Sequence, residues 1–181
     1  MLEWKTAPWP RGLLLACALA AALPGCGSAD EPDPDPGAPV IAPGDPRFER
    51  DPALDVENIS VHGEQRSHNM GMNCMGCHQA HGPGKGLFTT AGTVYDASGS
   101  PEPGGTVELR TASGGEGEVV LAIEVDDNGN FFTTESLPFP DQALFPFVWS
   151  ATGDATTFMP FPTISGACNL CHNEQKRVRL E

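Results

Sequence analysis

The chain has 181 residues, of which 39% are hydrophobic, and a formal net charge of −14 at pH 7. This length allows one ordinary domain, or one small domain with attached segments, and the low hydrophobic content excludes a large core. The negative charge argues against nucleic acid and anionic lipid surfaces as partners, because both are polyanions. The 21 Gly and 18 Pro favour turns and short strands over long helices.

The first 25 residues are predicted to be an export signal. The apolar run Leu13–Leu23 follows a basic start and is too short to span a bilayer, which needs about 20 residues. The segment Leu23-Pro24-Gly25-Cys26 resembles the bacterial lipobox. That resemblance implies that the chain is cut before Cys26 and that a lipid is attached to this cysteine, with ordinary cleavage near Ala20–Ala22 as the alternative.

The next segment, residues 26–46, is predicted to be a tether between the lipid-bearing cysteine and the folded part. After Cys26 it consists largely of Asp, Glu, Pro, Gly and Ala. Proline stiffens such a stretch, like charges extend it, and it has almost no apolar surface to bury.

Two copies of one cysteine arrangement follow, Cys74-Met75-Gly76-Cys77-His78 and Cys168-Asn169-Leu170-Cys171-His172. Both are C-x-x-C-H, the signature of c-type haem attachment. Two thiols at this spacing reach the two vinyl groups of one porphyrin, and the next residue places its imidazole beneath the iron. The sequence therefore predicts two covalently attached haem c groups, held by Cys74, Cys77, Cys168 and Cys171, with His78 and His172 as iron ligands.

Three other functions of the cysteine pairs are alternatives to haem attachment. Four thiolates could hold one structural zinc, although this leaves the His after each pair without a role. A thioredoxin-like redox dithiol requires a βαβ context, which the sequence lacks. Two disulfide loops are also compatible with an exported protein.

Candidates for the second axial ligand of each iron precede each motif. His68 lies six residues before Cys74, which is far enough for the chain to turn back over a haem. Met159 is the nearest soft ligand upstream of the second motif, and its alternative role is to fill a gap in a core. His62 and His81 could serve either iron or lie in solvated loops.

Between the motifs the sequence predicts a set of short strands. Alternation of apolar residues and turn residues favours an antiparallel β-sandwich. An Asn-Gly turn at Asn128-Gly129 between apolar runs is a hairpin signal, and Val119, Leu121, Ile123 and Val125 are expected on one face. The predicted strands lie in Leu87–Tyr95, Thr106–Arg110, Val119–Val125, Phe131–Thr134 and Phe145–Ala151.

The middle segment, roughly residues 88–152, resembles the carboxypeptidase-regulatory, prealbumin-like Ig-type modules of exported bacterial proteins. The likeness is carried by Ala91–Asp96, Pro103–Leu109 and Val125–Phe131. It implies a binding or spacing scaffold without catalytic residues. About 15 residues around each C-x-x-C-H motif resemble the haem sites of multihaem cytochromes c.

The predicted fold is thus mainly β, an Ig-like or prealbumin-like sandwich with short helical or loop haem-binding segments before and after it. We expect the two motif segments to meet on one side of the sandwich, since each is too short to cover a porphyrin alone. The predicted units are residues 1–25 (signal), 26–46 (lipidated Cys and tether), 47–86 (first haem segment), 87–163 (β-module) and 164–181 (second haem segment).

The function expected from these features is one-electron transfer at the cell envelope by an exported, lipid-anchored dihaem cytochrome, and not catalysis. Redox proteins, basic cytochromes among them, are the expected partners, because an acidic surface steers basic partners. The expected location is the outer membrane, facing the periplasm or the cell surface. The alternatives are a haem peroxidase-like enzyme, and a non-redox envelope module with zinc or disulfides at the cysteine pairs.

Overall fold

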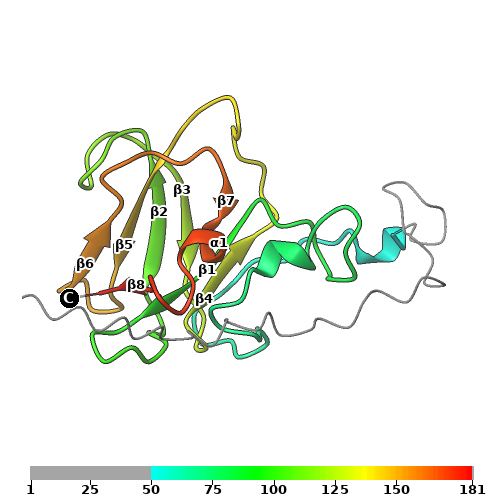
Figure 1. Ribbon diagram of the computed structural model, residues 1–181, viewed down its shortest axis with the longest axis horizontal. Coiled ribbons are helices and arrows are strands. Elements are labelled where there is room, and N and C mark those ends of the chain that lie inside the picture. Colours follow the sequence, from blue (N-terminus) through cyan, green and yellow to red (C-terminus); the bar gives the residue numbers. More distant parts are fainter. Residues whose placement is uncertain (1–49, 181) are drawn as a thin grey trace, which may run out of the picture. The chain divides into compact units, whose positions relative to one another are not determined.

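The computed structural model describes residues 50–180, and the predicted signal peptide, Cys26 and the predicted tether lie outside the described residues. The described part is mainly β, with two four-stranded sheets, as the sequence predicts (Figure 1). One sheet joins β4 (Asn130–Thr133), β1 (Thr90–Tyr95) and β7 (Gly166–Ala167), and β8 (Val178–Arg179) also pairs with β1. The other has the order β3 (Val119–Glu124), β2 (Thr106–Arg110), β5 (Phe145–Trp149) and β6 (Thr156–Phe158).

Helical structure in residues 50–180 is limited to single turns. They are the 3₁₀ turns η2 (Pro52–Leu54) and η3 (Cys74–Gly76) and the helix α1 (Cys168–Cys171). Both C-x-x-C sequences therefore lie on helical turns, and apart from these turns and η2 the described residues of the two predicted haem segments are loop or short strand.

The second sheet follows the sequence pattern at β2 and departs from it at the start of β3. Val107 and Leu109 are both buried, as the alternation in β2 predicts. On β3, Leu121 lies opposite Leu109 whereas Val119 lies opposite Arg110, so a bulge interrupts the register. Val119 is consequently 44% exposed and does not share the buried face of Ile123, which corrects the prediction for this strand.

The turn at Asn128-Gly129 is present, but it does not close a hairpin. β4 pairs with β1 and belongs to the first sheet, whereas β3 belongs to the second. The buried Asp126 carboxylate accepts hydrogen bonds from the backbone N–H groups of Asn128 and Asn130, at 3.0 Å each. These bonds fix a turn that carries the chain from one sheet to the other, and the hairpin prediction is wrong for this reason.

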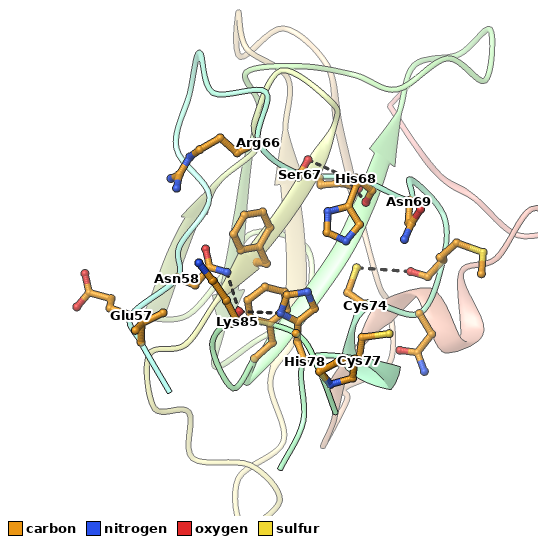
Figure 2. A pocket seen from close by; sticks show the side chains of 18 residues that line it. Glu57, Asn58, Arg66, Ser67, His68, Asn69, Cys74, Cys77, His78 and Lys85 are labelled. Atoms are coloured by element: carbon orange, nitrogen blue, oxygen red, sulfur yellow. Dashed lines mark hydrogen bonds between the residues drawn. The ribbon is translucent and has the colours of Figure 1, made fainter. Parts of the chain in front are cut away.

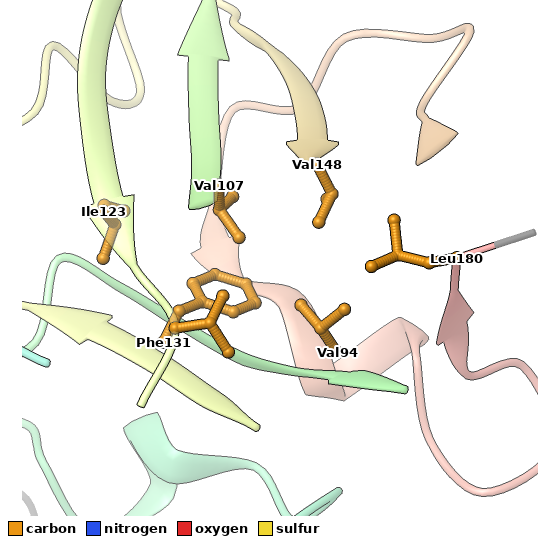
Figure 3. Packing of buried hydrophobic residues seen from close by; sticks show 7 residues of the cluster. Val94, Val107, Ile123, Phe131, Val148 and Leu180 are labelled. Atoms are coloured by element: carbon orange, nitrogen blue, oxygen red, sulfur yellow. The ribbon is translucent and has the colours of Figure 1, made fainter. Parts of the chain in front are cut away.

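The main core fills the space between the sheets (Figure 3). Val107 and Val148 project from the second sheet toward Val94 and Phe131 of the first. The carboxyl-terminal segment adds Leu180, which is 4% exposed. Residues 164–180 thus contribute two strands and a core residue to the sandwich, so the β-module continues beyond residue 163.

A second, smaller cluster lies on the opposite side of β1 and β4. Phe88, Ala91 and Phe132 are buried there, and Cys74 and Met75 of the first motif pack against them. Since neighbouring residues of a strand face opposite sides, Phe131 enters the main core while Phe132 faces the first motif. The outer face of the first sheet is therefore the floor of the first motif.

Replacing Ile123 with Ala tests the position of the main core. Ile123 is 2% exposed, so its loss should lower the free energy of unfolding by about 2–5 kcal/mol. Val120→Ala on the same strand is the matched control, because Val120 is 39% exposed, and should change stability by no more than about 0.5 kcal/mol. Chemical denaturation measures both, and equal effects would contradict the observed core.

Candidate functional site: two C-x-x-C-H turns on one strand

The first motif is organised by one 3₁₀ turn. Backbone N–H groups of Cys77 and His78 both donate to the Cys74 carbonyl, at 3.1 and 3.0 Å. This turn brings both thiols and the imidazole to one end of the first sheet. Cys74 is half-buried and Cys77 exposed, and neither forms a disulfide with another described cysteine.

The His78 ring is held in one orientation. Its Nδ1 lies 2.8 Å from the Lys85 carbonyl oxygen. A carbonyl only accepts, so Nδ1 carries the proton and Nε2 keeps its lone pair for a ligand. The ring also stacks on Phe88, with centroids 4.0 Å apart and planes 2° from parallel. Burial lowers the pKa of His78 below its usual 6.5, which favours the neutral form that can bind a metal.

His68 lies opposite His78, and the two rings point toward one another across the space beside Cys74 (Figure 2). Their centroids are 6.3 Å apart. An imidazole nitrogen is about 1.1 Å from its ring centre and a metal–nitrogen bond about 2.0 Å, so two rings on opposite sides of one metal have centres roughly 6.2 Å apart. The spacing of the two histidines fits axial ligation of a single iron.

The two histidines and the two thiols line a cavity of about 750 Å³ (Figure 2). Pockets for drug-sized ligands and cofactors span about 300–1,000 Å³, so this space suits a porphyrin. Phe88 and Phe132 form an apolar wall of this cavity, whereas Arg66 and Lys85 supply positive charge. The residues of the first motif therefore fit a haem with anionic propionates.

The loop after the first motif is fixed by Arg50. Its side chain is 6% exposed and donates to the carbonyls of Gly82 and Gly84, and it pairs with Asp55. Gly84 runs close to the His78 ring, since a Cβ there would lie 2.7 Å from the ring atoms Cγ and Nδ1. Sequence reasoning did not single out Arg50, Gly84 or Phe88, because none belongs to a motif.

The second motif repeats the local geometry of the first. The N–H of His172 donates to the Cys168 carbonyl at 2.9 Å, which closes α1. Nδ1 of His172 lies 3.0 Å from the Lys176 carbonyl oxygen, so its Nε2 is also left as an acceptor. In both motifs the histidine is thus held by a backbone carbonyl of the loop that follows it.

The two thiols of the second motif differ strongly in environment. Desolvation by burial raises the pKa of the Cys168 thiol to about 11, and the Thr90 hydroxyl lies 3.8 Å from its sulfur. Cys171 is exposed. Cys168 is therefore the buried cysteine of the pair and Cys171 the solvent-exposed one.

Cys168, His172 and Met159 line one cavity of about 290 Å³ at the edge of the main core. The structure thus brings three of the four predicted second-haem residues to one cavity, whereas Cys171 is exposed and does not line it. This cavity is smaller than the first, so it would cover only part of a porphyrin. Phe158, one of the lining residues, leaves 49% of its surface exposed beside it.

Arg177 lines this second cavity and has an unpartnered donor. Its Nε is buried without a hydrogen-bond partner, while Nη1 donates to the Gly99 carbonyl at 2.8 Å. Within residues 50–180, Arg50, Arg66 and Arg110 pair with carboxylates, whereas Arg177 and Arg179 do not. The positive charge of Arg177 beside this cavity fits an anionic group such as a propionate.

The two motif segments are joined by one hydrogen bond, although the first motif packs on the outer face of the first sheet and the cavity of the second adjoins the main core. Nδ2 of Asn169, inside the second motif, donates to the Met72 carbonyl at 2.8 Å, just before the first motif. Among residues 50–180, no group of three or more His, Cys, Asp and Glu side chains is arranged around a metal site. No helix in the described part is long and apolar enough to cross a membrane.

The remaining histidines fall outside these cavities. Nε2 of His62 donates to the Gly105 carbonyl at 2.9 Å and its backbone N–H to the Glu124 carboxylate, so His62 tethers its loop to the second sheet. His81 is exposed and lines neither cavity.

Comparison of the chain with protein-family models, with curated proteins and with solved structures found no match.

Replacing Gly84 with Ala tests the close approach to His78. The added methyl would overlap the ring and force it away from Phe88, and overpacking of this kind costs about 1–3 kcal/mol. Gly76→Ala is the control, because a Cβ there would be 3.9 Å from its nearest neighbour, the side-chain nitrogen of Asn73. Denaturation curves should show a loss for Gly84→Ala alone, and equal stability of the two variants would contradict the geometry.

Proposed function

We propose that this protein is an exported, lipid-anchored dihaem c-type cytochrome that transfers single electrons at the cell envelope. The observation that carries the proposal is the shared geometry of the two C-x-x-C-H turns. In each, a backbone carbonyl holds Nδ1 of the histidine and leaves Nε2 as an acceptor. Structural zinc knuckles give no reason for such an oriented histidine after each cysteine pair.

In the proposed function, Cys74 and Cys77 hold the first haem by thioether bonds and Cys168 and Cys171 hold the second. Haem iron supplies a one-electron couple between Fe(II) and Fe(III). His78 and His172 bind the two irons, and His68 is the second axial ligand of the first. Met159 is the corresponding candidate at the second site, where it shares the cavity with His172.

Aromatic side chains beside the first site orient the His78 ring. Phe88 fixes the plane of the His78 ring, and Phe132 packs against Phe88 with ring centroids 4.9 Å apart. The 6.3 Å separation of His68 and His78 supports a filled sixth position, which favours electron transfer over peroxidase chemistry at this iron. Peroxidase chemistry needs an open position.

The proposed partners are basic redox proteins. The chain carries 24 acidic and 10 basic residues, and a negative surface speeds encounter with a positive one. This steering should weaken as salt is added, because the screening length falls to about 8 Å at physiological ionic strength.

Haem content tests the function directly. Protein made together with cytochrome c maturation enzymes should give two haems per chain in a pyridine haemochrome assay, and its mass should exceed the polypeptide by two haems. A Cys168→Ala, Cys171→Ala form should keep one haem, since the first site has its own thiols. Protein with four unmodified thiols and stoichiometric zinc would overturn the proposal.

The anchor is tested separately at Cys26. The Cys26→Ala form should leave the membrane fraction after export, because the apolar run before it is too short to span a bilayer. Membrane fractionation with detection of covalent haem measures this. If the folded variant stayed with the membranes, a lipid on Cys26 would not be the anchor.

A further inference from the structure

The segment from Ser67 to Asn73 carries His68 and leads directly into the first motif. Three buried polar side chains hold it, each from a different element: Thr93 of β1, Asn130 of β4 and Asn169 of α1. Thr93 and Asn130 are each 1% exposed and Asn169 is 4% exposed. Buried polar groups of this kind are stable when every member finds a partner.

Each of the three side chains binds a different point of the segment. Nδ2 of Asn130 donates to the Ser67 hydroxyl at 2.8 Å and to the His68 carbonyl at 3.4 Å. The Thr93 hydroxyl accepts from the Gly71 N–H at 2.9 Å. As described above, Asn169 donates to the Met72 carbonyl.

The same three side chains are bonded to one another. The Thr93 hydroxyl donates to Oδ1 of Asn130 at 2.7 Å and accepts from Nδ2 of Asn169 at 3.0 Å. Oδ1 of Asn169 in turn accepts from the backbone N–H of Thr93 at 3.1 Å. A continuous hydrogen-bonded chain therefore runs from the second C-x-x-C-H motif to the backbone of His68.

Asn169 is tied to this place by the sheet. β7 pairs with β1 at Thr90 and Ala91, and β8 pairs with it at Val94 and Tyr95. Between these two pairings, Oδ1 of Asn169 accepts a hydrogen bond from the Thr93 N–H, which a neighbouring strand would otherwise bind. The second motif is thus built into the edge of the strand whose outer face supports the first.

We infer that Asn169 is a positioning residue that makes axial ligation by His68 depend on the second motif. This inference rests on the proposed function. Through Met72, Thr93 and Asn130, Asn169 fixes the segment that holds His68 opposite His78. Loss of its donor group should release that segment, so that His68 leaves the first iron for part of the time.

Asn169→Asp is the sharpest test, because it keeps the shape of the side chain and replaces its NH₂ donor with an acceptor. We expect the exported protein with covalent haem to gain a high-spin absorption band and to bind carbon monoxide at the first haem. The CO-reactive fraction should rise about tenfold over the parent protein, which corresponds to 1.4 kcal/mol. His68→Ala gives the reference for complete loss of the ligand.

Measurement in a Cys168→Ser, Cys171→Ser background restricts the signal to the first haem. Thr93→Val provides a second arm from a different element, since it removes the shared hydroxyl and keeps the side-chain volume. Both arms should give the same spectral change. If Asn169→Asp fails to fold, Asn169→Ala takes its place, because it removes the same donor without adding a carboxylate. Thr93→Val also removes the direct bond to the Gly71 N–H.

Leu170→Ala is the matched control, because Leu170 lies in the same turn and is 64% exposed. Its spectrum should equal that of the parent. A lower unfolding temperature for Asn169→Asp and Thr93→Val with unchanged spectra would overturn the inference, as would a similar spectral change in Leu170→Ala. A parent protein without covalent haem would overturn the proposed function instead, so the two failures are distinct.

Discussion

The hydrogen bonding of β1 is the constraint on which the rest of the structure depends. One edge of this strand pairs with β4 over residues 90–93. The other edge is shared in turn by β7, the Asn169 side chain and β8. Its inner face contributes Val94 to the main core, and its outer face contributes Ala91 to the floor beneath Cys74 and Met75. Both motifs are therefore positioned by one six-residue strand.

Strand β1 and the residues beside it provide apolar surface that neither motif segment can provide alone. A porphyrin needs apolar contact on both faces, and a C-x-x-C-H turn supplies almost none. The first motif obtains its contact from Phe88 and Phe132, which lie on or beside the first sheet. The cavity of the second motif is lined by Phe131 and Val148 of the main core. The sandwich in the proposed cytochrome is a wall for both sites as well as a spacer.

Much of this arrangement was predictable from the sequence, because it depends on local chemistry. The C-x-x-C-H turns, the bounds of β2 and the mainly β fold follow from spacing and alternation. Strands β7 and β8 have two residues each, too short for any periodic pattern, and their pairing is set by distant residues of β1. The Asn128-Gly129 turn predicted a hairpin from local sequence, yet the partner of β4 is chosen by long-range pairing. The position of His68 before Cys74 marked it as a candidate ligand, whereas the contacts of Asn169 with the His68 segment could not be predicted, since its partners are far away in the chain.

The two sites share a turn but differ in what surrounds it, and this difference bears on the reduction potentials that the two sites would give to haem iron. The first site has two facing imidazoles and a large cavity. The second combines a histidine with Met159 and Arg177 in a smaller cavity. A methionine ligand raises the reduction potential of haem iron. Were His172 and Met159 to hold the second iron, its reduction potential would therefore lie above that of an iron held by His68 and His78.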